Sequence, residues 1–544
     1  MFKIPLLARL QNSRPFRFVV FVLSACVFAV ALHVAWIAFT APLEIEVREG
    51  SAWLYVLAKR AGVDIYDTTQ VAFVNMNHGP LDPIVKTWIS RCLPVLPGHM
   101  VTRVFVLLTP VFLFAAAYRM TRKHLAAAML TAGALFLIFL HMSWVALVGR
   151  SDATAICGVV VCGVLAHQLL ISRHRNWTNR RYIFTQLGLG AASAAVFLTS
   201  WRYAPLFAAL QMVVLSTQLT NADPFRRWSR RWYVRVLARL GTGAKNVVIS
   251  SVLYLAGFAA IWGAVFLFEL HGDFRSYYRH FFGFFLADAG WGTYAASGSF
   301  HVLPAELYRT RLPVVLLLAA LMLWGFVRLR KHPGELVTWL VMLAANWFAV
   351  AYGYFKNQGG GGLYYFFEFF ALAWIFILHA FGRTRRWGGL AQLALVAAVA
   401  LTLPYKDLRA QRNLIAEIRT QGRIFRQQVA SMTKGEMIFG EETHLFKSRY
   451  QGELVDTGDA TSVIARTGYF GDSFTRTFNR YTQQLLSNPP KYVIGGLLGS
   501  ETTASRIMSA PLQEVLRSRY KLRAMARHTA PATDASQALF ERRF

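Results

Sequence analysis

The stretch EVREGSAWLYVLAKRAGVDIYD (residues 46–67) follows the first long apolar run and indicates how the chain is organised. The run before it, residues 18–40, can cross about 30 Å of hydrocarbon as a helix and is longer than a cleaved signal core. Three acids, Glu44, Glu46 and Glu49, gather where this run ends. Residues 51–62, SAWLYVLAKRAG, then fit one amphipathic helix along the membrane surface, ended by Gly62. The stretch therefore predicts a retained membrane helix followed by acids and an interfacial helix.

The composition of the whole chain is typical of a membrane protein. Of its 544 residues 55% are hydrophobic, and they fall in long runs instead of being dispersed. A net charge of +31 would indicate nucleic-acid binding in a soluble protein. Here the basic residues lie mostly at the ends of apolar runs, where they set topology and contact anionic membrane lipids, so no nucleic-acid partner is expected. The four cysteines show no spacing typical of a disulfide or a metal site.

Basic clusters between the apolar runs predict the topology. Eleven spans are expected, at roughly 18–40, 101–118, 124–147, 153–172, 184–200, 204–218, 247–269, 312–327, 335–354, 363–381 and 388–404. Every second connection carries a basic cluster, which is typical of the cytoplasmic side. The N-terminus is then cytoplasmic and, after an odd number of spans, the C-terminus is on the outer face.

The residues after the last predicted span change in character. Residues 407–432 have apolar side chains at helical spacing, and EMIFG (436–440), KYVIGGLL (491–498) and ALFERRF (538–544) are short β-type runs. The fold class expected is a mainly α, polytopic membrane protein with a small C-terminal extracytoplasmic α/β domain. Residues 1–404 form the transmembrane domain and residues 405–544 the second domain.

Two acids on the predicted outer face could act as a base. Glu49 lies beside Gly50 at the membrane edge, where partial desolvation would raise its pKa towards a value useful in catalysis. The alternative is an acid at a solvated helix N-terminus. Asp152 follows Arg150 where two spans meet, and the alternative to a catalytic role is that it caps a helix N-terminus.

Cations and a further acid on the outer face also need a reason. Arg202 and Lys356 are basic although the basic clusters otherwise lie on the cytoplasmic side. Binding of an anionic lipid headgroup such as a phosphate would explain their position on the outer face. The four glycines at 359–362 let the backbone approach a ligand closely. Glu368 lies inside a predicted span, so it is either functional or hydrogen-bonded to a neighbouring helix. The aromatic loop 273–294 is either a membrane-surface anchor or a substrate gate.

The ordered set of these motifs resembles the GT-C class of integral-membrane glycosyltransferases, bacterial members included. The pieces are REG (48–50), AGVDIYD (61–67), NHGPLDPI (77–84), GRSDATAI (149–156) and FKNQGGGGLYYFFEFFALA (355–373). They are short, but their order covers nearly the whole chain. Many members have a pair of acids in the first loop, whereas here Arg48 precedes Glu49. This departure weakens a metal site there; no cofactor is firmly implied, although a divalent cation is compatible with the resemblance.

The resemblance implies an inverting transferase that works on the outer face of a bacterial inner membrane, with its second domain in the periplasm. Its donor would be a polyprenyl-phosphate-linked sugar, and its acceptor a hydroxyl of a glycan, lipid or protein. Glu49 would be the general base, ahead of Glu44, Glu46 and Asp152, and Glu49→Gln would leave folding intact. The substrate would be bound by Arg150, Arg202, Lys356, Asn357, Tyr364, Tyr365, Glu368 and His78.

Three other functions are compatible with a polytopic chain. A transporter or flippase of lipid-linked sugars usually places polar or broken segments near mid-membrane, whereas these spans are nearly free of charge. A transferase of another lipid-modifying chemistry that relied on a metal would need grouped ligands, and His444 and His528 lie far apart in the tail. A non-catalytic scaffold is the third.

Overall fold

The computed structural model describes most of the apolar helices and part of the C-terminal region. The described residues are 13–42, 45, 48–67, 79–121, 123–171, 179–200, 232–278, 307, 311–330, 332–356, 363–383, 405–432, 438–440, 472, 476, 487, 491–496, 518–526 and 537–543.

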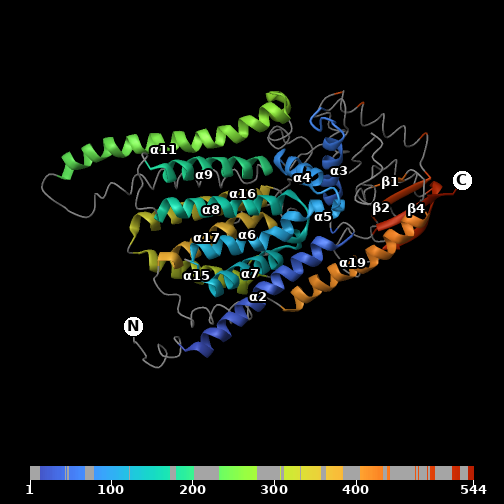
Figure 1. Cartoon of the computed structure of the whole chain (residues 1–544), viewed down its shortest axis with the longest axis horizontal. Helices are drawn as coiled ribbons and strands as arrows, with labels where there is room; N and C mark the ends of the chain where they lie inside the picture. Colours follow the sequence, from blue (N-terminus) through green and yellow to red (C-terminus); the bar gives the residue numbers. More distant parts are fainter. Residues whose placement is uncertain are drawn as a thin grey trace.

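Long apolar helices lie side by side and form a bundle (Figure 1). Among the described residues, eight helices are long and apolar enough to cross a membrane. They belong to α2 (Arg14–Thr40), α5 and α6 (Gly98–Thr102, Val104–Met120), α7 (Leu125–Met142), α8 (Ser151–Ile171), α9 (Arg180–Thr199), α11 (Trp232–Glu269), α15 (Leu312–Leu329), and η4 and α17 (Leu363–Phe366, Phe367–Arg383).

The predicted spans match these helices with three qualifications. The span expected at 335–354 is α16 (Pro333–Lys356), whose apolar part, Glu335–Phe348, is shorter than the other eight. The spans expected at 204–218 and 388–404 lie outside the described residues. The expected end of the span at 147 is wrong, because α7 stops at Met142 and a short turn, η1 (Trp144–Leu147), follows. The chain is thus a multi-pass, mainly α membrane protein, as expected.

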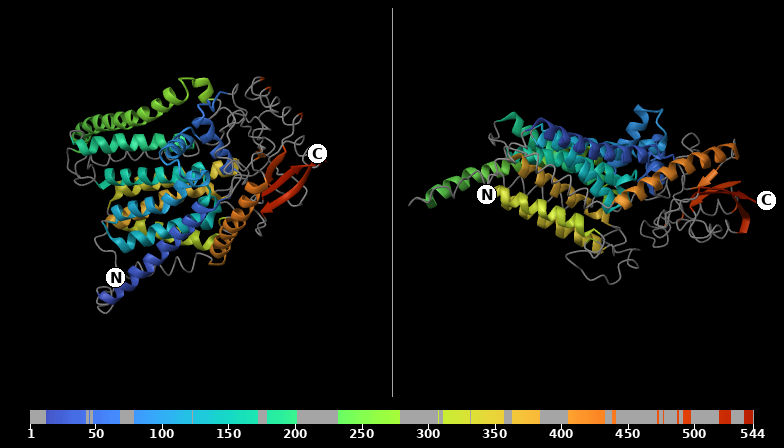
Figure 2. Two further views of the ribbon diagram at one scale, coloured as in Figure 1. Left: turned by 45° about the vertical axis from the view of Figure 1, so that its right-hand side comes forward. Right: turned by 90° about the horizontal axis from the view of Figure 1, so that it is seen from below.

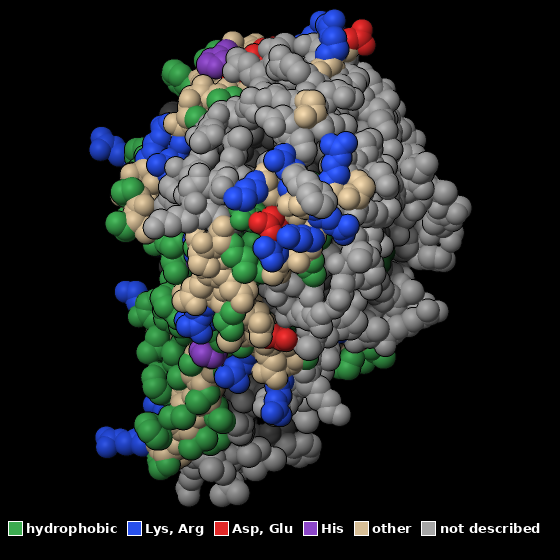
Figure 3. All heavy atoms as spheres, turned by 90° about the vertical axis from the view of Figure 1, so that its right-hand side faces the viewer, with side chains coloured by type: hydrophobic (Ala, Val, Ile, Leu, Met, Phe, Trp, Pro, Cys, Tyr) green, Lys and Arg blue, Asp and Glu red, His purple; other side chains and the backbone are tan. Residues whose placement is uncertain are grey.

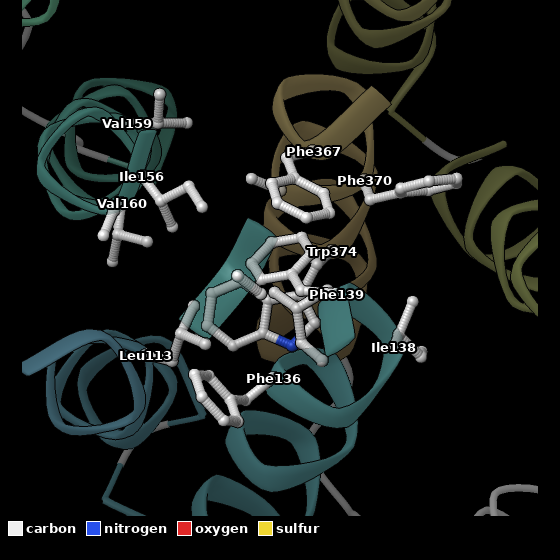
Figure 4. Close-up of a cluster of buried hydrophobic side chains, with 14 of the residues drawn as sticks. Leu113, Phe136, Ile138, Phe139, Ile156, Val159, Val160, Phe367, Phe370 and Trp374 are labelled. Carbon is white, nitrogen blue, oxygen red and sulfur yellow. The ribbon is translucent and has the colours of Figure 1, made fainter. Parts of the chain in front are cut away.

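The core of the bundle lies between α6, α7, α8 and α17. Figure 4 shows Leu113, Phe136, Phe139, Ile156 and Trp374 converging from these four helices. The Trp374 indole also donates a hydrogen bond to the Thr131 carbonyl at 3.2 Å, so its one polar atom has a partner inside the core.

Two glycines bring α9 and α11 into backbone contact. A Cβ placed on Gly190 would lie 1.9 Å from the Tyr254 carbonyl oxygen, and one on Gly257 would lie 2.0 Å from that of Leu187. Membrane helices without a hydrophobic force between them gain from such close approach. The C-terminal end of α9 contacts the segment just before residue 81, because the Thr199 carbonyl accepts a 2.8 Å hydrogen bond from the amide of Gly79.

Short helices cover one end of the bundle, called here the α3–α5 end: α3 (Arg48–Arg60), α4 (Leu81–Cys92) and α5. The predicted amphipathic helix after the first span is confirmed as α3, and Gly62 follows it with a φ of +78°, the left-handed conformation typical of a helix C-terminus. Its position along the membrane surface stays a prediction. Cys92 is the last residue of α4. In the aromatic loop, a short helix, α12 (Phe274–Tyr278), is described.

The C-terminal region extends from the same end of the molecule (Figure 2). The predicted amphipathic helix is confirmed as α19 (Tyr405–Met432), whose buried side chains include Ile415, Ile418, Phe425 and Val429. A four-stranded sheet in the order β1-β2-β4-β3 follows, from β1 (Ile438–Gly440), β2 (Tyr492–Gly496), β3 (Tyr520–Ala526) and β4 (Gln537–Arg542).

One strand of this sheet escaped the sequence analysis. β3, YKLRAMA, carries charged residues and helix-forming alanines, but pairing with β4 on one edge and contact with α19 override that local preference. Lys521 and Arg523, which project from this edge strand, both pair with Glu541 of β4. Figure 3 views this end of the molecule, where Lys and Arg side chains outnumber acidic ones on the coloured surface. The Arg523 guanidinium, which donates to the Glu541 carboxylate, holds the pKa of that carboxyl below its usual value.

Candidate functional site

A buried ion pair joins α3 to the junction of α5 and α6. Glu49, in the first turn of α3, is fully buried. Arg103 donates from Nε to Glu49 Oε1 at 2.8 Å and from Nη2 to Oε2 at 2.5 Å, a bidentate pair. Nη1 of the same guanidinium donates to the carbonyls of Ala38 and Ala41 at the end of α2. The expected partly exposed carboxylate is therefore wrong, because α2, α3 and α5 enclose it.

The same carboxylate also holds two backbone amides. The Ile45 amide donates to Glu49 Oε2 at 2.8 Å, and the Gly149 amide donates to Oε1 at 2.5 Å. Glu49 thus accepts four hydrogen bonds in all. Whether it is the general base stays a prediction, and the geometry gives it a second role as the point where three segments meet.

A second buried ion pair binds the backbone carbonyl of Gly149. Lys86 Nζ donates to Asp82 Oδ2 at 2.8 Å and to the Gly149 carbonyl at 2.9 Å. Asp82 also accepts from the Thr154 hydroxyl of α8 at 2.6 Å. Asp82 and Lys86 lie one turn apart on α4, so this pair connects α4 to the loop before α8 and to its first turns.

Arg150 and Asp152 follow Gly149 in the chain. Arg150 Nε is 3.3 Å from Asp152 Oδ2, and both side chains are buried. The Arg150 guanidinium also lies 5.0 Å from the ring centre of Tyr364, which follows the four-glycine segment in sequence. Arg150, Asp152 and Tyr364, three of the predicted site residues, therefore lie together. Tyr365 packs beside Tyr364 at 4.9 Å between ring centres.

Glu368 is hydrogen-bonded to a neighbouring helix, which was the alternative to a functional role. It is buried in the first turn of α17 and accepts a hydrogen bond from the Asn346 amide of α16 at 2.5 Å. This bond joins two neighbouring helices.

The remaining predicted site residues cannot be placed. Glu44, Glu46, His78, Arg202 and Asn357 lie outside the described residues. Lys356 is the last residue of α16, and its side chain is also outside the description. The expected meeting of Lys356 with the Arg202 segment stays a prediction.

The sequence analysis missed Arg103, Lys86 and Asp82. Two signals could have found them. Arg103 falls inside an expected apolar span, where a charge normally has a buried partner. Asp82 and Lys86 are spaced i, i+4, as an ion pair on a helix is.

The carboxylates at this end do not suit a divalent cation. Three buried carboxylates of the candidate site each face a basic side chain, Glu49 with Arg103, Asp82 with Lys86 and Asp152 with Arg150. Within the described part of the chain, no three His, Cys, Asp or Glu residues gather as a metal site. The donor set fits an arrangement of paired charges instead.

Comparisons with known proteins identify the fold. No protein-family model matches the chain, and no curated protein matches its sequence. Among solved structures, ArnT from Cupriavidus metallidurans bound to undecaprenyl phosphate aligns with a TM-score of 0.53 at 13% identity, over 97% of this chain and 98% of that one. ArnT in the apo state gives 0.49 at 14% identity, over 94% and 97%, and the oligosaccharyltransferase of Archaeoglobus fulgidus gives 0.43 at 12%, over 86% and 69%. The first of these establishes a GT-C-like fold over nearly the full chain.

Proposed function

We propose that the protein is a membrane glycosyltransferase that moves a sugar from a polyprenyl-phosphate donor to an acceptor hydroxyl. The observation that carries the proposal is the group of three buried carboxylate–cation pairs at the α3–α5 end of an apolar bundle. Charges in such a place are costly and mark functional sites. A structure of the same fold holds undecaprenyl phosphate, a lipid whose tail needs a bilayer and whose headgroup needs cations.

The proposed chemistry is a single displacement. A carboxylate takes the proton of the acceptor hydroxyl as its oxygen attacks the anomeric carbon. The bond from that carbon to the phosphate oxygen breaks, and polyprenyl phosphate leaves with the electron pair, so the configuration at the anomeric carbon inverts. Basic side chains stabilise the leaving phosphate, and Arg150, Arg202 and Lys356 are assigned to this task.

The general base is drawn from Glu49 and Asp152. The four donors that occupy Glu49 support Asp152, because a base must offer a lone pair to the incoming hydroxyl. Asn357, Tyr364, Tyr365, Glu368 and His78 are proposed to line the sugar and acceptor sites.

The location proposed is the inner membrane of a bacterium. The N-terminus is cytoplasmic, and residues 405–544 form a periplasmic domain that follows a transmembrane domain of residues 1–404. The charge bias of the connections supports this orientation. The acceptor is then a glycan, lipid or protein on the periplasmic side.

Release of polyprenyl phosphate from defined donors tests the function. Purified protein in lipid nanodiscs is given a panel of radiolabelled undecaprenyl-phosphate sugars together with envelope extract as acceptor, and both released lipid and labelled product are measured. We expect transfer from at least one donor, and Asp152→Asn to lower its rate by about 10²- to 10⁴-fold. The exposed Asp273→Asn is the matched control and keeps the rate. Absence of release and of labelled product with every donor would contradict the proposal.

A further inference from the structure

One residue in the candidate site, Gly149, is held through its backbone amide and its backbone carbonyl by two buried ion pairs. The amide of Gly149 donates to Glu49, which Arg103 holds, and the carbonyl of Gly149 accepts from Lys86, which is paired with Asp82. These four side chains are called here the Gly149 clamp. Three of them are fully buried, and Asp82 is 4% exposed, so solvent does not compete for the bonds.

The clamp leaves no room for a side chain at its centre. A Cβ on Gly149 would lie 3.0 Å from Arg103 Cγ, from the Thr102 carbonyl carbon and from Thr102 Cβ. This is tighter than most real Cβ contacts, and two of the three atoms belong to Thr102, the last residue of α5. Glycine is therefore the residue that lets the loop approach Arg103 this closely.

The loop beyond Gly149 carries the groups proposed to react. The Arg150 amide donates to the Val148 carbonyl at 2.8 Å, so the chain turns sharply at Gly149. Asp152 lies in the first turn of α8, and the Thr154 hydroxyl of that helix donates to Asp82. Fixing the backbone of Gly149 therefore fixes the positions of Arg150 and Asp152.

We propose that the four clamp residues are positioning residues that place Arg150 and Asp152 for sugar transfer, and that Glu49 acts through Gly149 rather than on the acceptor. This inference rests on the proposed function. Both charge pairs are internally neutral, so the clamp orders the loop without adding a net charge beside Arg150. Catalytic rates respond steeply to such placement, since a 1 Å displacement can cost about 10²-fold.

Stability alone does not account for the clamp. A buried ion pair is often no more stabilising than apolar side chains of similar volume, because desolvation opposes the attraction between the charges. Apolar residues would, however, leave the backbone amide and the backbone carbonyl of Gly149 without these partners. The clamp therefore holds a loop in place as well as pairing charges, and the order of that loop can be measured.

Charge-neutral double variants separate positioning from stability. One variant, Asp82→Asn with Lys86→Met, removes the donor to the Gly149 carbonyl, keeps an acceptor for Thr154, and touches neither candidate base. The other, Glu49→Met with Arg103→Met, removes the acceptor of the Gly149 amide. Lys59→Met with Glu269→Gln is the matched control, because this pair joins α3 to α11 away from Gly149.

Two readouts are taken on each purified variant, after its folded fraction is measured. We expect sugar transfer per folded molecule to fall about 10²-fold in both clamp variants, with the midpoint of the pH–rate profile unchanged because Asp152 is intact. Hydrogen exchange of the peptide 145–152 accelerates in both, and the control changes neither readout. Gly149→Ala, which keeps every charge, is expected to lower the rate as well, whereas Gly263→Ala in open space on α11 does not.

The outcomes distinguish the clamp from the proposed function. Wild-type hydrogen exchange in the clamp variants overturns the clamp even if the wild type proves inactive in every transfer assay. Full activity in the Asp82/Lys86 variant, together with loss in Glu49→Gln, overturns it in favour of Glu49 as the base. If a double variant fails to fold, Gly149→Ala decides: unchanged rate and exchange there contradict the proposal.

Discussion

At the residue scale, the environment of Glu49 changes what its substitution should do. The carboxylate is sealed from solvent with the Arg103 guanidinium, so Glu49→Gln leaves a buried charge without its counter-charge. Breaking such a pair costs about 3–5 kcal/mol, and we expect the free energy of unfolding in detergent to fall by that order. Glu269→Gln is the control, because its carboxylate is 25% exposed and pairs with Lys59, and it should cost about 1 kcal/mol or less. Equal losses in the two variants would show that the burial of Glu49 has no energetic consequence. The intact folding expected from the sequence assumed a surface carboxylate at the edge of a helix, whereas this first-turn side chain is buried.

At the element scale, the contact between α9 and α11 supports the candidate site from behind. Because α9 ends on the Gly79 amide just before α4, a shift of α9 is passed to Asp82 and Lys86. Gly190→Ala forces a methyl group against the backbone of α11, so we expect a loss of about 1–3 kcal/mol and a lower thermal midpoint in detergent. Gly263→Ala places the same methyl group in open space on α11 and should be neutral or stabilise the helix by up to about 1 kcal/mol. Indistinguishable midpoints for the two variants would contradict the close helix contact.

At the scale of the whole molecule, the cysteines offer a test of orientation with the native sequence. Cys157 and Cys162 are buried, and Cys26 is exposed on the apolar span α2, where a charged reagent does not penetrate. Cys92 is exposed at the α3–α5 end. We expect a membrane-impermeant maleimide to label intact spheroplasts at Cys92, and Cys92→Ser to abolish the labelling. Labelling that appears only after permeabilisation would place this end in the cytoplasm and contradict an extracytoplasmic site.

The sequence by itself determined the membrane class, most span positions and the two amphipathic helices α3 and α19. These features depend on local hydropathy, on charge at span ends and on single residues such as Gly62, all of which act through neighbours in the chain. The motifs also pointed to the segments that the structure brings together, with Arg150 and Asp152 beside Tyr364.

Only the tertiary structure decided how the acids are partnered. Glu49 and Arg103 are 54 residues apart, and Lys86 and Gly149 are 63 apart, so neither contact follows from any local pattern. Strand β3 likewise owes its conformation to β4 and α19 and not to its own residues. The physical reason is that an ionised group buried at the end of a bundle must find its counter-charge wherever the helices bring one, and helix packing, not sequence distance, sets which charge that is.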